Sequence, residues 1–590
     1  MATLNDQYFD KHDEIKRECF LCTLDPKHSC HEAQLEGRIV AAQERLVAGE
    51  RTPIVILDTG TARVEVRLYD QYYRSLIREL KARGDVIGTY NLTLRIYHLP
   101  VEPFTIEYKE HSRQCYQTNT YTLAVLEPDT LLNITDLNQA EYCPRQYILN
   151  RLIPSKPSAA TLRGNLIHHC FKELLKEHDR GRFNPQHSST DKQSESPLAS
   201  LHHHLEQALD LYSIDIALAD ISSDGLREEV APHLESLAQW YEQERNTLWD
   251  MPTAYANQQG ETNEGNQVRA ETFLLAPEIG LRGRLDLFWQ QAGRQRLLEL
   301  KTGGASGDLP KRDHRWQVYG YHALLTVRRD SKMKKALATL LYSGTPGSAQ
   351  AFGIPASIRE IQRVNETRNI LILSRVTNIP TMPPGPGRCT KCAMLTQCQR
   401  ISSILYWQPP EPDPQVMAAR QLIAASEVTQ PHSHMTSLQS AVSDTSEDRD
   451  FFARYYRLLQ MEGRAGELQQ ARLWQTPVAE RIQQGTAIRG LEIQDTPTID
   501  KDGWVTVFHC QNTSELREGD EILLSNGDPI TGEVVTGTIM AISSEQVTVW
   551  TRELIAHPTL IDRYDNDLVH IRTLQNLLRW LQADAHLRDL

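Results

Sequence analysis

Two segments near the middle of the chain decide its fold: LRGRLDLFW at residues 281–289 and RLLELK at residues 296–301. The residues between them include Ala292-Gly293, which suits a turn, so the sequence predicts a β-hairpin. If the pairing is centred on that turn, Asp286 falls opposite Glu299. Because strand side chains alternate, Glu299 and Lys301 share that face. The intervening leucines then point into the core; they are Leu285, Leu287, Leu298 and Leu300.

The shared face of this hairpin gathers two carboxylates and one ammonium group. Like charges directly opposite each other destabilise a sheet, so Asp286 and Glu299 require compensation. A divalent cation would offset the repulsion, and hard oxygen ligands suit Mg²⁺ or Mn²⁺. The alternative is a solvated hairpin face on which Lys301 neutralises one acid, because a D…E-x-K pattern alone often occurs by chance.

Composition sets the broad class of the protein. The chain has 590 residues, of which 40% are hydrophobic and 24% charged, enough for roughly three or four soluble domains of about 150 residues. No stretch approaches the roughly 18 apolar residues of a membrane span. The N-terminus lacks the apolar core of a signal peptide, which predicts a cytoplasmic, intracellular protein with no membrane partner. A net charge of −13 argues against a generic nucleic-acid coat protein. It does not exclude a nuclease, because a bound metal reverses the local sign of its acidic ligands.

Two groups of cysteines have the spacing of metal ligands. Cys389, Cys392 and Cys398 form a C-x2-C-x5-C cluster, and Cys143 lies far upstream. In a reducing compartment, clustered cysteines suggest metal binding more than disulfides. The N-terminal group either binds Zn²⁺ or consists of free thiols in a mobile terminus; its members are Cys19, Cys22, Cys30 and His31.

Four motifs resemble, in their order and spacing, the PD-(D/E)xK nucleases of RecB type. They are Gly-x3-His at 164–168, Gly-Arg-x-Asp at 283–286, Glu-x-Lys at 299–301 and Gln-x3-Tyr at 317–321. With Cys143 and the downstream cysteine cluster added, the sequence is most similar to the iron-sulfur subgroup. That subgroup includes the CRISPR adaptation nucleases, the AddB nuclease and the nuclease half of the flap-processing nuclease-helicases.

The resemblance implies a metal site and the residues that form it. A second histidine, His169, follows His168 directly, and only the Gly-x3-His spacing selects His168. The residues that match the family's metal ligands are His168, Asp286 and Glu299, with the backbone carbonyl of Leu300 as a further ligand.

Further roles follow from the same resemblance. Lys301 matches the lysine that positions or deprotonates the attacking water. Gln317 and Tyr321, one helical turn apart, match the pair that orients this lysine and the DNA. Without the upstream motifs, both would be interpreted as packing residues of an amphipathic helix with Trp316 and Leu324.

The cysteines match a cofactor site of the subgroup. Cys143, Cys389, Cys392 and Cys398 correspond to the four ligands of a [4Fe-4S] cluster. An all-cysteine site suits zinc equally well, so the sequence leaves both metals open. With either metal, the site would join the two ends of one domain.

The expected fold is α/β, with a restriction-endonuclease-like nuclease core, a mixed sheet flanked by helices and two small β-barrel-like domains. A polar helical stretch is expected around Glu44. The segment Leu560–Asp565 is similar to the one just ahead of the motor in the flap-processing nuclease-helicases. The predicted parts are a Cys/His segment (1–50), a small barrel of oligonucleotide-binding or scaffold type (51–133), the nuclease domain (134–407), a linker (408–447), a helical stalk (448–500), a second barrel (501–555) and a C-terminal helical segment (556–590).

The expected function is that of a Mg²⁺- or Mn²⁺-dependent deoxyribonuclease that cleaves single-stranded DNA ends or flaps. It would work with a helicase in repair, replication or phage defence. The sequence contains no Gly-x4-Gly-Lys-Ser/Thr phosphate loop, so the helicase is expected as a separate partner or as a part beyond this chain. The alternative is a catalytically silent DNA-binding or scaffolding subunit. The intact charges at Asp286, Glu299 and Lys301 favour the enzyme.

Overall fold

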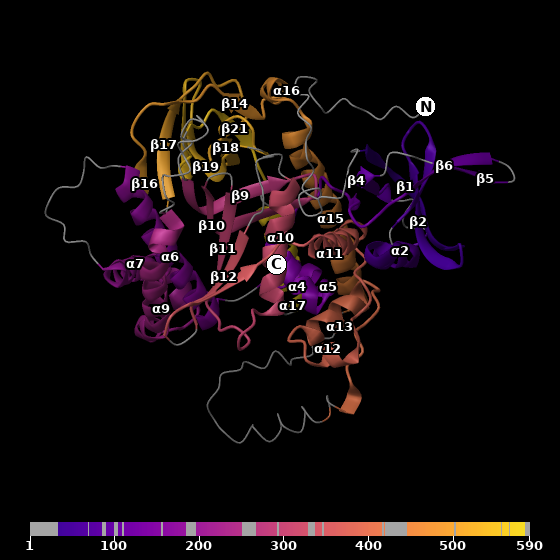
Figure 1. Ribbon diagram of the computed structural model, residues 1–590, viewed down its shortest axis with the longest axis horizontal. Coiled ribbons are helices and arrows are strands. Elements are labelled where there is room, and N and C mark those ends of the chain that lie inside the picture. The colour runs from indigo at the N-terminus through magenta and orange to yellow at the C-terminus, as the bar shows by residue number, and fades with distance from the viewer. Residues whose placement is uncertain are drawn as a thin grey trace.

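The computed structural model contains three β-sheets connected by helices (Figure 1). None of the helices it describes is long and apolar enough to cross a bilayer. The N-terminal zinc prediction at Cys19, Cys22, Cys30 and His31 lies outside the described residues. These are 33–583 without 69, 85–89, 100–103, 109–110, 155–156, 184–195, 250–266, 292–293, 328–336, 345–346, 416–417, 419–444, 501–502, 531, 556 and 566.

The first sheet has the strand order β5-β6-β3-β2-β1-β4-β7 and packs against helix α2. The sequence predicted a helix around Glu44, and this prediction is wrong. Glu44 lies in a strand that pairs with the buried residues Ile54–Leu57, so pairing with an apolar strand overrides the polar local composition. The elements are β1 (Ala33–Val47), β2 (Glu50–Asp58), β3 (Arg63–Arg67), α2 (Asp70–Ala82), β4 (Thr93–Leu99), β5 (Phe104–Tyr108), β6 (His111–Gln117) and β7 (Leu123–Leu126).

The second sheet has the order β13-β12-β11-β10-β8, with β9 on the free edge of β10. It is mixed, because β10 and β11 are antiparallel whereas β11 and β12 are parallel. The strands are β8 (Leu132–Asn133), β9 (Gln267–Ala276), β10 (Leu281–Gln291), β11 (Arg294–Lys301), β12 (Leu337–Tyr342) and β13 (Gln350–Ile354).

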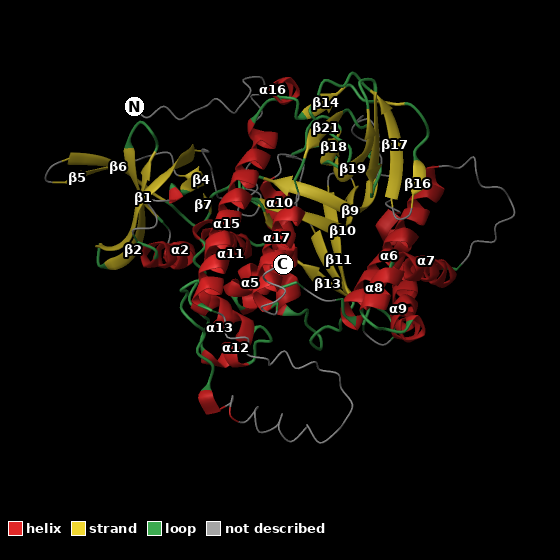
Figure 2. Ribbon diagram, turned by 180° about the vertical axis from the view of Figure 1, so that it is seen from behind, coloured by secondary structure: helices red, strands yellow, loops and turns green. Residues whose placement is uncertain are grey.

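Helices flank both faces of this second sheet, which confirms the predicted α/β class. Figure 2 shows the first sheet at one end of the molecule and α6 to α9 at the other. Helices α6, α7 and α9 form one apolar core with the sheet. Helices α4, α10 and α11 form a second apolar core with it. The helices are α4 (Ile134–Tyr142), α5 (Pro144–Leu152), α6 (Ala159–Phe183), α7 (Pro197–Leu211), α8 (Ser213–Leu218), α9 (Ser223–Trp249), α10 (Arg312–Val327), α11 (Ile358–Thr377), α12 (Pro386–Thr390) and α13 (Leu395–Ile404).

The C-terminal module consists of a long helix, a curled sheet and a closing helix. The long helix starts with a capping box between Thr445 and Asp448. The sheet has the order β14-β21-β18-β19-β20-β17-β15, with β16 on β17. Its elements are α15 (Ser446–Gln475), α16 (Val478–Gln483), β14 (Ala487–Arg489), β15 (Glu492–Ile493), β16 (Thr498–Asp500), β17 (Gly503–His509), β18 (Glu521–Ser525), β19 (Val534–Ile542), β20 (Gln546–Thr551), β21 (Leu560–Arg563) and α17 (Leu568–Gln582).

Helix α11 joins the first sheet to the second through buried amide side chains. Tyr73 Oη donates to Gln362 Oε1 at 2.9 Å. Asn365 and Asn369 each donate to the carbonyl of Ala124 at 2.8 Å, so side chains of α11 satisfy the backbone of β7. These three polar residues of α11 are fully buried. They hold their place only because the first sheet supplies their partners.

Arg368 lies on the same helix and is also fully buried. Its guanidinium donates to the carbonyls of Leu126, Glu127 (2.7 Å), Thr130 (2.8 Å) and Gly280 (3.3 Å). These carbonyls come from the end of β7, the loop after it and the β9–β10 turn. One side chain therefore fastens three segments of backbone.

Ion pairs connect the C-terminal module to the second sheet. Asp567, just before α17, accepts from Arg375 of α11 at 2.9 Å and lies 3.6 Å from Arg282 of β10. Arg375 also pairs with Glu467 of α15. These side chains are at most 14% exposed. The C-terminal module is thus held to the core partly by buried charge.

Acid is expected to loosen this junction. Burial alone would raise the pKa of Asp567, but Arg375, Arg282 and Arg151 hold it well below its usual range. Because the folded pKa is depressed, the stability it contributes is present above the unfolded pKa of about 4 and is lost as the pH falls below it. The measurement is thermal unfolding of wild type and Asp567→Asn between pH 7 and pH 3. At pH 7 the free energy of unfolding of Asp567→Asn should be lower than that of wild type by about 3 kcal/mol. The difference in stability between the two proteins should narrow as the pH falls below about 4, because the contribution of Asp567 is lost progressively down to its depressed folded pKa; parallel curves would contradict the assignment.

Candidate active site

The candidate active site lies where β11 separates from β10. Strand β9 pairs along one edge of β10, so β8 and β11 share the other edge. The last pair with β11 is Leu287 with Leu298, and the register places Asp286 across from Glu299, as predicted. Beyond it, the backbone amide of Leu300 donates to Asp286 Oδ2 at 2.7 Å. The carboxylate of Asp286 therefore holds the two strands together at the point where they diverge.

The alternation of β10 changes at this point. All four predicted core leucines are buried. Leu285, however, packs with Ile134 of α4 and Tyr321 of α10, whereas Leu287 belongs to the core formed with α6, α7 and α9. Residues two apart in a regular strand would face the same side. The irregular backbone lies across from Asp286 in β9, where Glu271 has φ +53°, and Asp286 places its Oδ1 3.5 Å from Nδ1 of His168 on α6.

Lys301 is held by a network of side chains from β11 and α10. Its Nζ donates to Glu299 Oε1 at 2.8 Å and to Gln317 Oε1 at 2.7 Å. Gln317 Nε2 in turn donates to Glu299 Oε1 at 2.5 Å and to Tyr321 Oη at 3.2 Å. The Tyr321 hydroxyl donates to the carbonyl of Arg284 at 2.6 Å. Both α10 residues are buried, as packing residues would be, but their polar ends converge on Lys301 and on β10.

Helix α6 contributes a histidine to the site. His168 Nδ1 lies 3.5 Å from Asp286 Oδ1. Burial would lower the pKa of His168, but Asp286 and Glu299 raise it above its ordinary value. His169 lies instead among Lys172, Glu173 and His204, and burial together with Lys172 lowers its pKa to about 4. The structure places His168, and not His169, beside Asp286.

The two acids of the hairpin are in different electrostatic states. Burial, and then the neighbouring Asp286, raises the pKa of Glu299 to about 7. Burial would also raise the pKa of Asp286, but His168, Lys301 and the Leu300 amide hold it below its usual range. The surroundings of Asp286 therefore favour its ionised form, whereas burial beside Asp286 shifts Glu299 toward its protonated form. Such a separation of two neighbouring carboxyl groups is typical of active sites.

One carboxylate oxygen is left without a partner in the described part of the chain. Glu299 Oε2 is buried and accepts no hydrogen bond there. A buried oxygen in this state costs roughly 1–3 kcal/mol unless another group satisfies it. Two carboxylates and an imidazole would suit a divalent cation. Across the described ranges, however, no three His, Cys, Asp or Glu side chains are grouped closely enough to form a complete metal site. The Leu300 amide and Lys301 already engage one oxygen of each acid.

Glu271 is an acidic neighbour that the sequence interpretation missed. The pairs Leu285–Thr272 and Leu287–Ala270 place it on β9 directly across from Asp286. Its backbone is left-handed, with φ +53°, and its Oε2 lies 3.9 Å from Arg284 Nη1. Burial, and then Asp286, raises its pKa. The sequence contained one signal for this neighbour. A four-residue turn at Pro277–Gly280 pairs the strands before and after it in the register that aligns Glu271 with Asp286.

Asn138 of α4 is a second residue that was missed. It donates from Nδ2 to Gln317 Oε1 at 3.0 Å and so helps to orient the amide that contacts Lys301. No local pattern marks Asn138, because its contact to α10 exists only in the folded chain.

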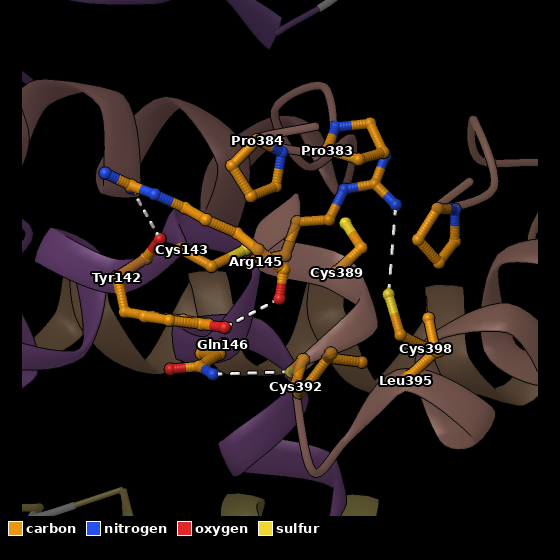
Figure 3. A pocket seen from close by; sticks show the side chains of 13 residues that line it. Tyr142, Cys143, Arg145, Gln146, Pro383, Pro384, Cys389, Cys392, Leu395 and Cys398 are labelled. Carbon is orange, nitrogen blue, oxygen red and sulfur yellow. Dashed lines mark hydrogen bonds between the residues drawn. The ribbon is translucent and has the colours of Figure 1, made fainter. Parts of the chain in front are cut away.

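The four cysteines Cys143, Cys389, Cys392 and Cys398 line one pocket (Figure 3). They belong to the α4–α5 junction, α12, the turn after α12 and α13. All four are free thiols. The structure thus brings together the two ends of the segment that the sequence assigned to one domain.

Polar side chains from α5 reach the sulfurs in this pocket. Gln146 Nε2 donates to Cys392 Sγ at 3.6 Å, and Arg145 Nη1 donates to Cys398 Sγ at 4.0 Å. Burial raises the pKa of the Cys143 and Cys389 thiols in the same pocket. At the edge of the pocket, Tyr142 and Arg388 exchange two hydrogen bonds of 2.6 and 2.9 Å between side chain and carbonyl. The residue types suit a four-cysteine metal site, but within the described ranges no three of these sulfurs are grouped closely enough to hold a metal ion as they stand.

Two comparisons with known proteins, one with a family model and one with a curated relative, both lead to Dna2. The family model described as DNA replication factor Dna2 matches residues 64–291. The match includes His168 and Asp286 but ends before Glu299. A curated relative, the DNA replication ATP-dependent helicase/nuclease dna2 of Schizosaccharomyces pombe, is 22% identical over 299 residues. The alignment covers 48% of this chain and 19% of the relative.

The chain therefore spans less than a fifth of the length of that relative. A solved structure, "Crystal structure of SSO0001", covers 39% of this chain and 94% of its own, with 15% identity and a TM-score of 0.16. A similarity at that level carries no argument about fold. The sequence similarities support a relationship to the flap-processing nucleases of DNA replication and repair.

Proposed function

We propose that this chain is a metal-dependent DNA nuclease that cleaves single-stranded ends or flaps. The observation that carries the proposal is the placement of Lys301 Nζ between Glu299 Oε1 and Gln317 Oε1, beside Asp286 where the two strands diverge. The similarity to the Dna2 family, whose matched relative is named a helicase/nuclease, supports the same reaction class.

The residues present fit a metal-assisted hydrolysis of a phosphodiester. His168, Asp286 and Glu299, with the carbonyl of Leu300, would hold Mg²⁺ or Mn²⁺, which would supply Lewis-acid chemistry at the scissile phosphate. The unpartnered Oε2 of Glu299 is the observation that favours such an ion.

The protein's own groups prepare the attack. Lys301 is a partly buried ammonium: burial would lower its pKa, but Glu299 and Asp286 raise it. It can therefore orient the attacking water and stabilise the negative charge that develops on the phosphate. Gln317 holds the ammonium in place, and Tyr321 fixes the amide of Gln317 and the carbonyl of Arg284.

The test is cleavage of labelled single-stranded DNA in the presence of Mn²⁺. Asp286→Asn keeps the size of the side chain but removes its charge, and it should lower the rate by roughly a thousandfold. Asp210→Asn, an exposed aspartate of α7, is the matched control and should cut like wild type. Equal rates of cleavage in all three proteins would remove the assignment of Asp286, and no cleavage by the wild-type protein would instead favour a catalytically silent DNA-binding or scaffolding subunit.

We assign Cys143, Cys389, Cys392 and Cys398 to a [4Fe-4S] cluster with a structural role. The protein purified without oxygen should be brown, whereas a zinc form would be colourless. Cys398→Ser should lose the visible absorbance and lower the melting temperature by several degrees, roughly the effect of 2 kcal/mol in a protein of this size. Cys510→Ser, a buried thiol outside the pocket, should keep the colour. An unchanged spectrum in Cys398→Ser would remove the assignment.

A helicase is the proposed partner, in replication, repair or phage defence. The chain itself contains no phosphate-loop motif, whereas the matched relative is named an ATP-dependent helicase/nuclease and is much longer. An ATPase, either a separate subunit or a further part of a longer polypeptide, would supply unwound DNA to this nuclease. Co-purification with such a subunit, and cleavage of duplex ends only in its presence and with ATP, would be the expected result.

A further inference from the structure

The C-terminal module contacts the strand that carries Asp286. Arg282 lies on β10, four residues before Asp286. Its Nη1 donates to the hydroxyl of Tyr564 at 2.9 Å, and its Nη2 lies 3.6 Å from Asp567 Oδ2. Its Nε donates to Asn133 Oδ1 at 2.9 Å, on the neighbouring strand β8. Two of the three groups around this buried guanidinium therefore come from the C-terminal module.

Asp567 has an unusual conformation at this contact. It occupies the N-cap position of α17, where an aspartate normally accepts a hydrogen bond from the start of the helix. Its carboxylate makes no such bond and pairs with Arg375 and Arg282. Its φ is +64°, a left-handed backbone that is strained for a residue with a side chain. Asp567 thus makes its contact with the arginines although it leaves the helix uncapped by its side chain and has a strained backbone.

A second contact reaches the helix that carries His168. Lys176 lies two turns after His168 on α6, at the spacing that places both on one face. Its Nζ is 2.8 Å from Glu553 Oε1, just after β20 of the C-terminal sheet. Both side chains are at most 20% exposed. The module thus reaches both elements that carry the histidine and the aspartate of the site.

These polar contacts are not needed merely to attach the C-terminal module to the second sheet. Leu275 and Phe273 of β9 already pack with Leu523, Val534 and Tyr564 of the module in an apolar cluster. Apolar packing is non-directional, whereas the hydrogen bond from the Arg282 guanidinium to Tyr564 fixes geometry, and the ion pairs of Arg282 with Asp567 and of Lys176 with Glu553 add attraction at the same two elements. The polar contacts are placed on β10 and α6, whose separation sets the 3.5 Å distance between His168 and Asp286.

We infer that Tyr564, Asp567 and Glu553 are positioning residues of the candidate active site. Through Arg282 and Lys176 they fix β10 against α6, so that the nuclease geometry depends on the placement of the C-terminal module. The inference rests on the proposed function. A displacement of the segment around Tyr564 and Asp567 would be transmitted to Asp286 along one short strand.

The experiment compares Tyr564→Phe, Asp567→Asn and Glu553→Gln with a control in the same module. Asp562 makes a buried pair with Arg481, at 2.8 and 3.1 Å, and the other hydrogen bonds of Arg481 among the described residues go to carbonyls of the same module, those of Leu473 and Thr476. Asp562→Asn therefore weakens the module without releasing β10 or α6. Tyr564→Phe removes one hydroxyl and keeps the ring, so it remains informative if Asp567→Asn does not fold.

The readouts are kcat and KM for single-stranded DNA cleavage, thermal stability, and amide hydrogen exchange in residues 281–287. The positioning variants should lower kcat by about tenfold with KM within about twofold, since small displacements of reacting groups have effects of this order. Tyr564→Phe and Asp567→Asn should also accelerate exchange in β10. Asp562→Asn should lower the melting temperature but leave kcat and β10 exchange at the wild-type level.

Two results would overturn the inference: unchanged kcat and β10 exchange in both Tyr564→Phe and Asp567→Asn, or an equal loss of kcat in Asp562→Asn. Failure of the proposed function looks different, because the wild-type protein would then not cut DNA at all. In that case the hydrogen exchange of β10 still decides whether the module positions this strand.

Discussion

Replacing Lys301 with methionine is expected to lower the rate of DNA cleavage by roughly three orders of magnitude while the protein stays folded. Methionine has a similar length but cannot donate the hydrogen bonds that Nζ makes to Glu299 and Gln317. It also removes the only cation in direct contact with Glu299 among the described residues. The loss should fall on kcat rather than on KM, because the ammonium stabilises charge that develops during the reaction. Single-turnover cleavage of labelled single-stranded DNA measures it.

Lys81→Met provides the control for this variant. Lys81 is an exposed residue of α2 on the first sheet, far in the fold from the candidate active site. It loses the same charge and should cut at the wild-type rate. If Lys301→Met keeps more than a third of the wild-type kcat, the ammonium has no role in the reaction, and the assignment of this site to hydrolysis loses its main support.

Replacing Arg368 with methionine should have the largest effect on stability. Its guanidinium is fully buried and satisfies backbone carbonyls of Glu127, Thr130 and Gly280 as well as Leu126. Burial lowers the pKa of Arg368 to about 9, so the group is still charged at neutral pH. Methionine would remove this donor from all four carbonyls; those of Glu127 and Gly280 would keep the backbone amides of Thr130 and Leu132, whereas a buried carbonyl left without any donor costs roughly 1–3 kcal/mol. We expect a loss of about 3 kcal/mol or more, or a protein that does not accumulate.

Urea unfolding followed by fluorescence and far-UV circular dichroism measures this loss, with the midpoint of the first transition as the readout. Arg363→Met on the same helix is the control. The side chain of Arg363 is 37% exposed, and its ion pair with Glu360 is long, at 3.5 Å. This variant should change stability by less than about 1 kcal/mol. Similar midpoints for both variants would show that Arg368 does not fasten the backbone segments around it.

The sequence was sufficient to predict the hairpin and its register. Two apolar segments around a short turn allow few pairings, so the alignment of Asp286 with Glu299 follows from local information. The convergence of Cys143 with Cys389, Cys392 and Cys398 was inferred from a family resemblance. Their common pocket is an outcome of the fold.

Other parts of the site depend on contacts that no local pattern encodes. Glu271 faces Asp286 because two strands pair, and Asn138 reaches Gln317 because two helices cross. The contact of Arg282 with Tyr564 joins residues 282 positions apart in the chain. Likewise, Glu44 lies in a strand because its partner strand is apolar, although its own surroundings are polar. In each case a tertiary neighbour, absent from the local sequence, decides the outcome.

The amide side chains that α11 buries against β7 have a practical consequence for anyone dissecting this protein by truncation. A recombinant fragment starting at residue 134 would retain Gln362, Asn365 and Asn369 but delete Tyr73 and Ala124, their bonding partners. It would also uncover the leucines and valines that both halves share in one continuous core. Such a shortened polypeptide should aggregate, so dissection by gene truncation is better started upstream of β1 than at the apparent boundary between barrel and nuclease.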